Sequence, residues 1–185
     1  MGILSRLFGR SQPAPAPQQP PAPRTTEDRA RERHEGIQEM LAEQAASDPR
    51  RAREIARASV DGVHYLELVE PIKQAKREGR NEDALALCYQ AIQGAENDRP
   101  QLDNFSEGYQ DLVRRGVIGP VGEGWVPAPA YTEHAAIILR KLKRPDEEAA
   151  VLERYLAHVP EERRAGHKFT ERLAKVRELQ QRAQG

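Results

Sequence analysis

Few side chains in this sequence are of a type and at a spacing that could support catalysis or bind a metal. The chain contains five histidines and a single cysteine, Cys88. His34-Glu35 is not followed by a second histidine at the spacing of a helical zinc protease site, and one cysteine cannot supply a zinc cluster. Cys88 falls on the apolar stripe of an expected helix, which favours a buried structural thiol over a nucleophile. We therefore expect no catalytic residue, no metal and no cofactor.

The segment 116–129 is rich in residues that break regular structure, and its glycines could at first be taken for a phosphate-binding loop. A phosphate loop requires a preceding strand and a following Lys-Ser/Thr pair, and neither is present. We therefore interpret 116–129 as a loop insertion. It contains Trp125, the only tryptophan of the chain. Two roles stay open for this side chain: an anchor for a partner, or packing over the neighbouring helices.

Length and composition exclude further classes of protein. The 185 residues carry 29 Lys+Arg and 29 Asp+Glu, so the net charge gives no general preference for nucleic acid or for acidic partners. No apolar run approaches the ~18 residues that a membrane span needs. The strong core formers are unevenly distributed, because 25 of the 36 Leu, Ile, Val and Phe residues lie between Val60 and Pro160. One domain with its core in this region is the expected organisation.

Composition and helix signals divide the chain into consecutive parts. These are a short amphipathic segment (1–10), a proline-rich disordered linker (11–24), charged helices (25–60), a helical core (61–160) that contains the loop insertion 116–129, and a C-terminal helix (161–185).

Apolar residues at helical spacing predict an all-α fold built from antiparallel helical hairpins. Thr25 or Thr26 caps the first helix, and Asp48-Pro49 starts the second. Pro71 kinks the third helix or marks its true start, and Gly94 together with Asn97–Pro100 closes the fourth. No segment of alternating strand pattern stands out. The expected helices cover 25–46, 50–59, 61–78, 102–115, 130–142, 147–158 and 161–181, and the fourth begins at 81 and is closed within 94–100.

Two helix–turn–helix units can be superposed along the chain. The run 76–84 aligns with 141–149, which pairs Ala84 with Ala149. The first unit also has Gly79 at its turn and Ala91 seven residues after Ala84, and the second closes at Pro160. This pattern resembles the tetratricopeptide repeat, over about 65–160. The two units are 65 residues apart, so a degenerate unit or an insertion lies between them. The resemblance implies a right-handed stack of hairpins with a groove that binds a peptide or protein.

The same resemblance implies that the groove is lined by the first helix of each unit. The partner-binding candidates carried over in this way are Val69, Lys73, Lys76, Arg77, Tyr131, His134, Ile138 and Lys141, with Trp125 added from the loop. The basic members of this set favour an acidic or carboxylate-bearing ligand. The alternative is that these cations only keep the helices soluble.

The first ten residues could form a short hook. Ile3, Leu4, Leu7 and Phe8 would lie on one face of a helix, beside Arg6 and Arg10. Such a hook suits a partner groove or a weak contact with a membrane surface, and the alternative is a disordered tail without a role. The opening ten residues also resemble the start of many small bacterial proteins.

These observations lead to a non-enzymatic interaction or scaffold module. We expect a bacterial protein that is cytoplasmic, or peripheral to the membrane, and that binds a peptide or protein partner. The alternative is a regulatory protein associated with nucleic acid through its basic terminal segments. Residues 161–185 contain seven Lys/Arg against four Glu, but no recognition motif for nucleic acid.

Overall fold

The computed structural model describes residues 25–184, and within this range the chain is mostly helical, as expected. The expected hook at 1–10 and disordered linker at 11–24 lie outside the described residues. The helices are α1 (Thr26–Ser47), α2 (Pro49–Arg57), α3 (Val69–Arg77), α4 (Asn81–Asn97), α5 (Glu107–Arg114), α6 (Pro129–Lys141), α7 (Pro145–Leu156), α8 (Glu161–Arg164) and α9 (Lys168–Gln184), with short 3-10 helices η1 (Tyr65–Leu68) and η2 (Leu102–Asn104).

The first two helices begin where the sequence predicts. Thr25 caps α1 in a capping box: its side chain accepts the backbone N–H of Asp28, and the Asp28 carboxylate accepts the backbone N–H of Thr25. Asp48 caps α2 by accepting the backbone N–H of Arg50 at 2.8 Å, and Pro49 is the first helical residue. The chain therefore reverses within two residues between α1 and α2.

The expected helix over 61–78 begins later than the sequence suggests. Asp61 and Gly62 both have positive φ, 53° and 78°, and form a tight turn between β1 (Ser59–Val60) and β2 (Val63–His64). These strands pair antiparallel with Val60 opposite Val63. Asp-Gly is a strong signal for such a hairpin, and it overrides the helical spacing of the apolar residues around it. Pro71 lies in the first turn of α3, so it marks the true start of this helix.

Of the two stop signals expected for the fourth helix, α4 continues through Gly94 and ends at the second, Asn97. Gly94 is needed inside the helix because another part of the backbone crosses it closely. A Cβ atom at this position would lie 2.6 Å from the carbonyl oxygen of Ala58 and 2.9 Å from the Cβ of Tyr65. The glycine therefore permits packing of the β1–η1 segment against α4.

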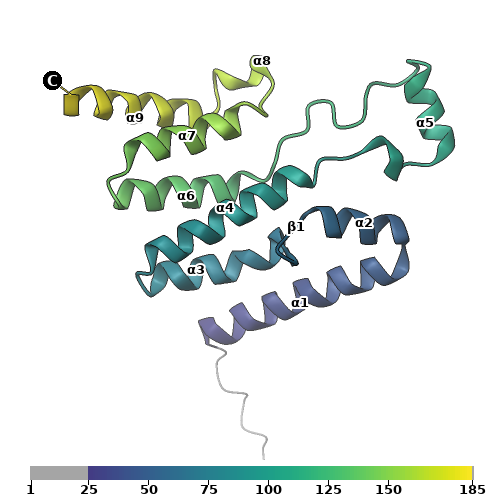
Figure 1. Cartoon of the computed structure of the whole chain (residues 1–185), viewed down its shortest axis with the longest axis horizontal. Coiled ribbons are helices and arrows are strands. Elements are labelled where there is room, and N and C mark those ends of the chain that lie inside the picture. The colour runs from purple at the N-terminus through teal and green to yellow at the C-terminus, as the bar shows by residue number, and fades with distance from the viewer. Residues whose placement is uncertain (1–24, 185) are drawn as a thin grey trace, which may run out of the picture.

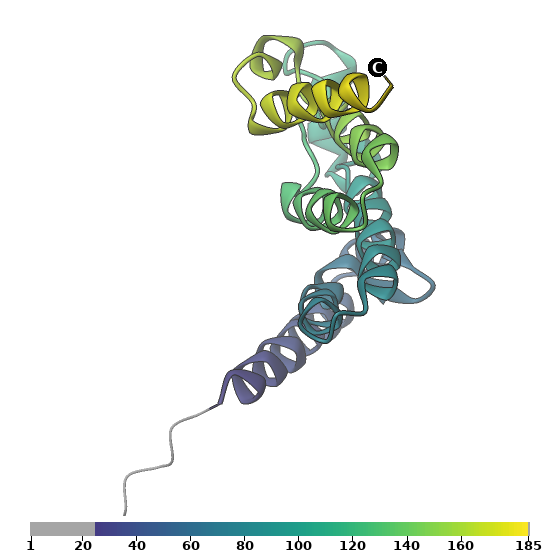
Figure 2. The same cartoon turned by 90° about the vertical axis from the view of Figure 1, so that its left-hand side faces the viewer.

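The helices α3 and α4 form one antiparallel hairpin and α6 and α7 form a second, and the two hairpins pack on each other (Figure 1). The helix α4 packs against both α3 and α6, α6 packs against α7, and α7 packs against α9. Figure 2 shows the resulting two layers, with α3 and α6 on one side and α4 and α7 on the other. A continuous core runs through these layers from Leu68 to Val176.

The C-terminal segment differs from the single helix expected over 161–181. It divides into α8 and α9 around Gly166, and the ring Nδ1 of His167 accepts the backbone N–H of Phe169 at the start of α9. Phe169 and Val176 are fully buried in the core, which therefore extends beyond residue 160. Within residues 25–184 no helix is both long enough and apolar enough to cross a membrane.

A buried carboxylate joins three of the packed helices. Glu148 of α7 is 2% exposed and accepts hydrogen bonds from Arg140 of α6 at 3.1 Å and from Arg172 of α9 at 2.8 Å. A buried charge of this kind is tolerated only when it is paired.

We expect Glu148→Gln to lower the free energy of unfolding by about 1–3 kcal/mol, because it leaves both arginines without their counter-charge. Urea titration followed by circular dichroism measures the change. Glu153→Gln is the matched control on the same helix: Glu153 pairs with Arg177 at the surface, so about 0.5 kcal/mol or less should be lost. Equal losses in the two variants would contradict the proposed role of Glu148.

Gly94→Ala should destabilise the fold by about 1–3 kcal/mol, because the added methyl group collides with a backbone carbonyl that cannot move independently. Gly108→Ala in α5 is the matched control. Its Cβ would meet nothing within 4 Å, so its helix propensity should raise stability slightly. Thermal unfolding of the two variants gives shifts of opposite sign if the crossing at Gly94 is as close as described.

Candidate functional site

Three helices contribute to one surface, which we call the α3/α6/α9 face. The Nζ of Lys76 in α3 lies 2.8 Å from the Nδ1 of His134 in α6. The Nζ of Lys168 in α9 donates to the carboxylate of Glu133 in α6 at 2.7 Å. These two contacts place the three helices side by side, so polar side chains that are far apart in the sequence meet on one surface.

An apolar side chain occupies the part of this face between α6 and α9. Ile137 is 44% exposed and contributes to a hollow of about 430 Å³. The hollow is otherwise polar and mostly cationic, and its remaining lining residues are Arg140, Lys168, Glu171, Arg172 and Lys175. An apolar residue surrounded by cations can contact both an apolar and an acidic group of a partner.

Two of the residues expected in the groove are not available to a partner. Tyr131 and Ile138 are 3% and 1% exposed and belong to the core. The Tyr131 hydroxyl donates to the backbone oxygen of Tyr65 at 3.1 Å, which fixes the ring inside the fold. The expectation for these two residues is wrong, because the exposed stripe of α6 passes through Ile137 instead. A shift of one residue rotates a helical position by about 100°.

The other groove candidates lie at the surface or close to it. Lys73, Lys76 and His134 are half-buried, and Arg77 and Lys141 are exposed. Val69 is half-buried, and its side chain packs against the core. The cations of α3, which the resemblance implied as groove residues, lie outside the core stripe of this helix, which consists of Glu70, Ile72 and Ala75.

The α3/α6/α9 face carries more positive charge than its carboxylates neutralise. Glu70 pairs with Lys73 and with Arg33 of α1, and its pKa is lowered chiefly by the hydrogen bond from Arg33. Glu133 is engaged by Lys168. Among the described residues, no ion pair is made by four cations of this face. These are Lys76, Arg77, Lys141 and Lys175.

The pKa of His134 depends on the charges of this face. Its pKa is lowered first by burial and then by the charges of Lys76 and Lys73, with Glu133 acting in the opposite direction. The imidazole is therefore neutral at pH 7, and its Nδ1 can accept a hydrogen bond from the Lys76 ammonium group.

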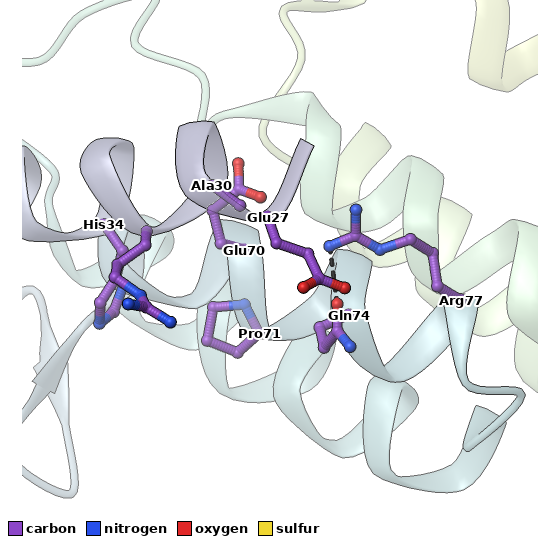
Figure 3. A pocket seen from close by; sticks show the side chains of 8 residues that line it. Glu27, Ala30, His34, Glu70, Pro71, Gln74 and Arg77 are labelled. Atoms are coloured by element: carbon purple, nitrogen blue, oxygen red, sulfur yellow. Dashed lines mark hydrogen bonds between the residues drawn. The ribbon is translucent and has the colours of Figure 1, made fainter. Parts of the chain in front are cut away.

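A pocket of about 360 Å³ lies between α1 and α3, next to the same face (Figure 3). Pro71 lies between His34 of α1 and Gln74 of α3, and Arg77 donates to Gln74 at 2.8 Å. The Nδ1 of His34 is buried without a hydrogen-bond partner. The sequence suggests only solvated helices in this region. Ala30 and His34 lie one turn apart within a charged stretch, and this spacing could have indicated which side of α1 packs against the protein.

No group of three or more potential metal ligands occurs within residues 25–184. Burial raises the pKa of the Cys88 thiol to about 12, and Lys76 lowers it only slightly, so this thiol is protonated at neutral pH. Among residues 25–184 we therefore assign no arrangement of nucleophile, base and metal.

Trp125 lies away from the α3/α6/α9 face. Its indole packs edge-on against His158, with ring centroids 6.0 Å apart, and it is half-buried between two hollows. None of the residues that line these hollows belongs to the α3/α6/α9 face as defined above. Any contact that Trp125 makes with a ligand is therefore separate from that face.

Comparisons with known proteins found no matching family model and no significant similarity to a curated protein or to a solved structure.

Lys76→Met should raise the pKa of His134 toward its ordinary value, because it removes the cation nearest to the imidazole. A proton NMR titration of the histidine C–H signals measures this shift. Lys141→Met removes a cation of the same face that does not contact His134, so it serves as the matched control. An equal effect of both substitutions would contradict the assigned contact between Lys76 and His134.

Proposed function

We propose that this chain is a non-enzymatic interaction module that binds an acidic peptide or protein segment on its α3/α6/α9 face. The observation that carries the proposal is that the face which exposes Ile137 also carries four cations that make no ion pair within the described residues, and one of them, Lys175, lines the hollow beside Ile137. Acidic side chains of a partner would pair with Lys76, Lys141 and Lys175, and an apolar side chain would enter the hollow beside Ile137. Such complementarity favours fast and selective association more than high affinity.

The tetratricopeptide-like, right-handed stack is part of this proposal. Small residues support it, because Ala84 and Ala91 are fully buried where α4 contacts its neighbours. The contact of α4 with both α3 and α6 gives further support, since a helix of one hairpin must then pack on the next hairpin. In such a stack the first helices of successive hairpins share one face, and α3 and α6 fit this role (Figure 2).

The N-terminal segment would act as a tether in this proposal. Ile3, Leu4, Leu7 and Phe8 would bind a partner groove or a membrane surface, and the proline-rich residues 11–24 would separate this hook from the helices. The protein would then work in the cytoplasm, or at its boundary with a membrane.

Nucleic acid remains the alternative ligand, but contacts of the C-terminal cations favour a protein partner. Lys168, Arg172 and Arg177 are paired with Glu133, Glu148 and Glu153. Arg163 and Arg164 donate to backbone oxygens. Most of the positive charge of 161–185 is thus used inside the protein and is not free for phosphates.

Selection from a random peptide library displayed on phage, with the full chain as the target, should enrich acidic peptides that contain an apolar residue. Lys76→Glu/Lys141→Glu should weaken binding of a selected peptide by about tenfold or more, because it replaces two cations that make no ion pair within the described residues by two carboxylates that repel an acidic ligand. Fluorescence anisotropy of the labelled peptide gives the affinity.

Arg114→Glu/Arg115→Glu in α5 is the matched control, since it changes the net charge equally at a surface remote from α3. Its affinity for the peptide should stay within about twofold. The proposal fails if the selected peptides are not acidic or if the two double variants bind equally. It also fails if only DNA binds, with the steep salt dependence of phosphate contacts.

A further inference from the structure

A second hollow, of about 450 Å³, lies between α2 and the segment that follows α4. In Figure 1 this segment leads from the end of α4 to α5, above α2. The hollow has the size of a small-molecule site. Its lining residues are Asp48, Arg50, Arg51, Glu54, Arg57, Asp98, Pro100, Asn104, Phe105 and Trp125.

The acidic groups of this hollow already have partners within the protein. The Asp48 carboxylate caps α2, and Glu54 pairs with Arg51 at 2.6 Å. Asp98 accepts the hydroxyl of Tyr65 at 2.8 Å. The three carboxylates of the hollow are thus engaged within the protein.

Several donors, in contrast, stay free. Among the interactions of residues 25–184, none involves the guanidinium group of Arg50 or the indole N–H of Trp125. Arg57 uses only its Nε, which donates to the backbone oxygen of Asn97 at 3.2 Å. Arg50 and Arg57 are two turns apart on α2 and line the same hollow, and their remaining guanidinium N–H groups are donors that suit a carboxylate.

Asn104 adds a donor and an acceptor that have no partner. Both polar atoms of its carboxamide, Oδ1 and Nδ2, are buried, and neither makes a hydrogen bond. Leaving such a group without a partner is costly, and native structures rarely do so without a reason. The edge of another amide, which offers one N–H and one C=O, would satisfy both atoms at once.

Two aromatic side chains and a proline complete the lining of the hollow. Phe105 is stacked on Tyr109, with ring centroids 4.6 Å apart, and Trp125 is held by His158. Pro100 contributes to the same lining. The hollow therefore also has space for an apolar or aromatic side chain.

The geometry points to a binding site for an N-acylated α-amino acid with a free carboxylate, as occurs at the carboxyl terminus of a peptide. The carboxylate binds Arg50 and Arg57, the acyl amide pairs with Asn104, and the side chain packs against Trp125 and Phe105. The three arginines and three acids of the lining balance formally, which suits a ligand with one negative charge better than a phosphate dianion.

This site shares no residue with the α3/α6/α9 face, so either can exist without the other. Binding at the hollow is tested with defined small molecules, whereas the α3/α6/α9 face is tested with selected acidic peptides. The failure of one experiment thus leaves the other assignment unaffected.

Trp125 gives a direct signal from this site, because it is the only tryptophan of the chain. The full chain is titrated with N-acetylphenylalanine, and the tryptophan emission is recorded. N-acetylphenylalanine amide lacks the carboxylate and 3-phenylpropionate lacks the acyl amide. Each should bind about tenfold more weakly than N-acetylphenylalanine. A tetrapeptide that ends in phenylalanine distinguishes the sources: tighter binding than N-acetylphenylalanine identifies a peptide terminus, and equal binding identifies the free acylated amino acid.

Substitutions assign the two recognition contacts. Arg50→Gln/Arg57→Gln should remove the preference for the carboxylate over its amide, and Asn104→Leu should remove the preference for N-acetylphenylalanine over 3-phenylpropionate. Arg53→Gln is the matched control, because Arg53 is exposed on α2 and does not line the hollow. Circular dichroism confirms that each variant is folded.

Saturable binding with both preferences, each lost in its own variant, supports the site. An unchanged emission with every probe overturns it, provided that isothermal titration calorimetry also detects no binding. Binding that ignores the carboxylate, or that Arg53→Gln weakens as much as the double variant, likewise overturns the assignment.

Discussion

The close approach of α4 to its neighbours is the constraint on which the rest of the structure depends. Ala84, Cys88, Ala91 and Ala95 recur along one side of α4, and each is at most 2% exposed. Small side chains let the axes of two helices come close enough to interdigitate. Because α4 packs on both α3 and α6, this stripe sets the separation of those helices, and hence the contact between Lys76 and His134.

Buried carboxylates then determine which cations of the α3/α6/α9 face are free. Glu148 holds Arg140 and Arg172, and Glu70 holds Lys73 and Arg33 of α1. These ion pairs already order the long side chains of the cations. Those side chains therefore lose less conformational entropy when a partner binds. The cations without such partners provide the net charge, and the neutral His134 adds none at pH 7 because its pKa is lowered. The face thus combines ordered ion pairs with free cations around Ile137.

The sequence predicted most helices because their apolar residues, caps and glycine or proline breakers agree with one another. It failed where a contact distant in sequence decides the local structure. Gly94 looks like a helix-ending residue in the sequence, but α4 continues through it. The glycine is needed there because the backbone of Ala58 crosses the helix at this point. In α6, Ile137 and Ile138 have identical side chains. Which of the two is buried depends on the helices that pack against α6, and the sequence does not specify these. The helix is buried on most of its circumference, so periodicity alone leaves its exposed stripe undetermined.

The hollow beside Trp125 gives no local sequence signal, because its lining residues range from Asp48 to Trp125. It is nevertheless joined to the core by a chain of contacts. Asp98, at its edge, accepts the hydroxyl of Tyr65, and the backbone of Tyr65 accepts the hydroxyl of Tyr131 in α6. The two tyrosine rings also pack edge to face, 5.8 Å apart. Burial raises the pKa of both phenols, so these hydroxyls are protonated and can donate at neutral pH. Since α6 also carries Ile137 and His134, the helix that belongs to the proposed peptide-binding face also anchors the wall of this hollow. The two sites thus keep a fixed relation as long as the packing of α4 and α6 is intact.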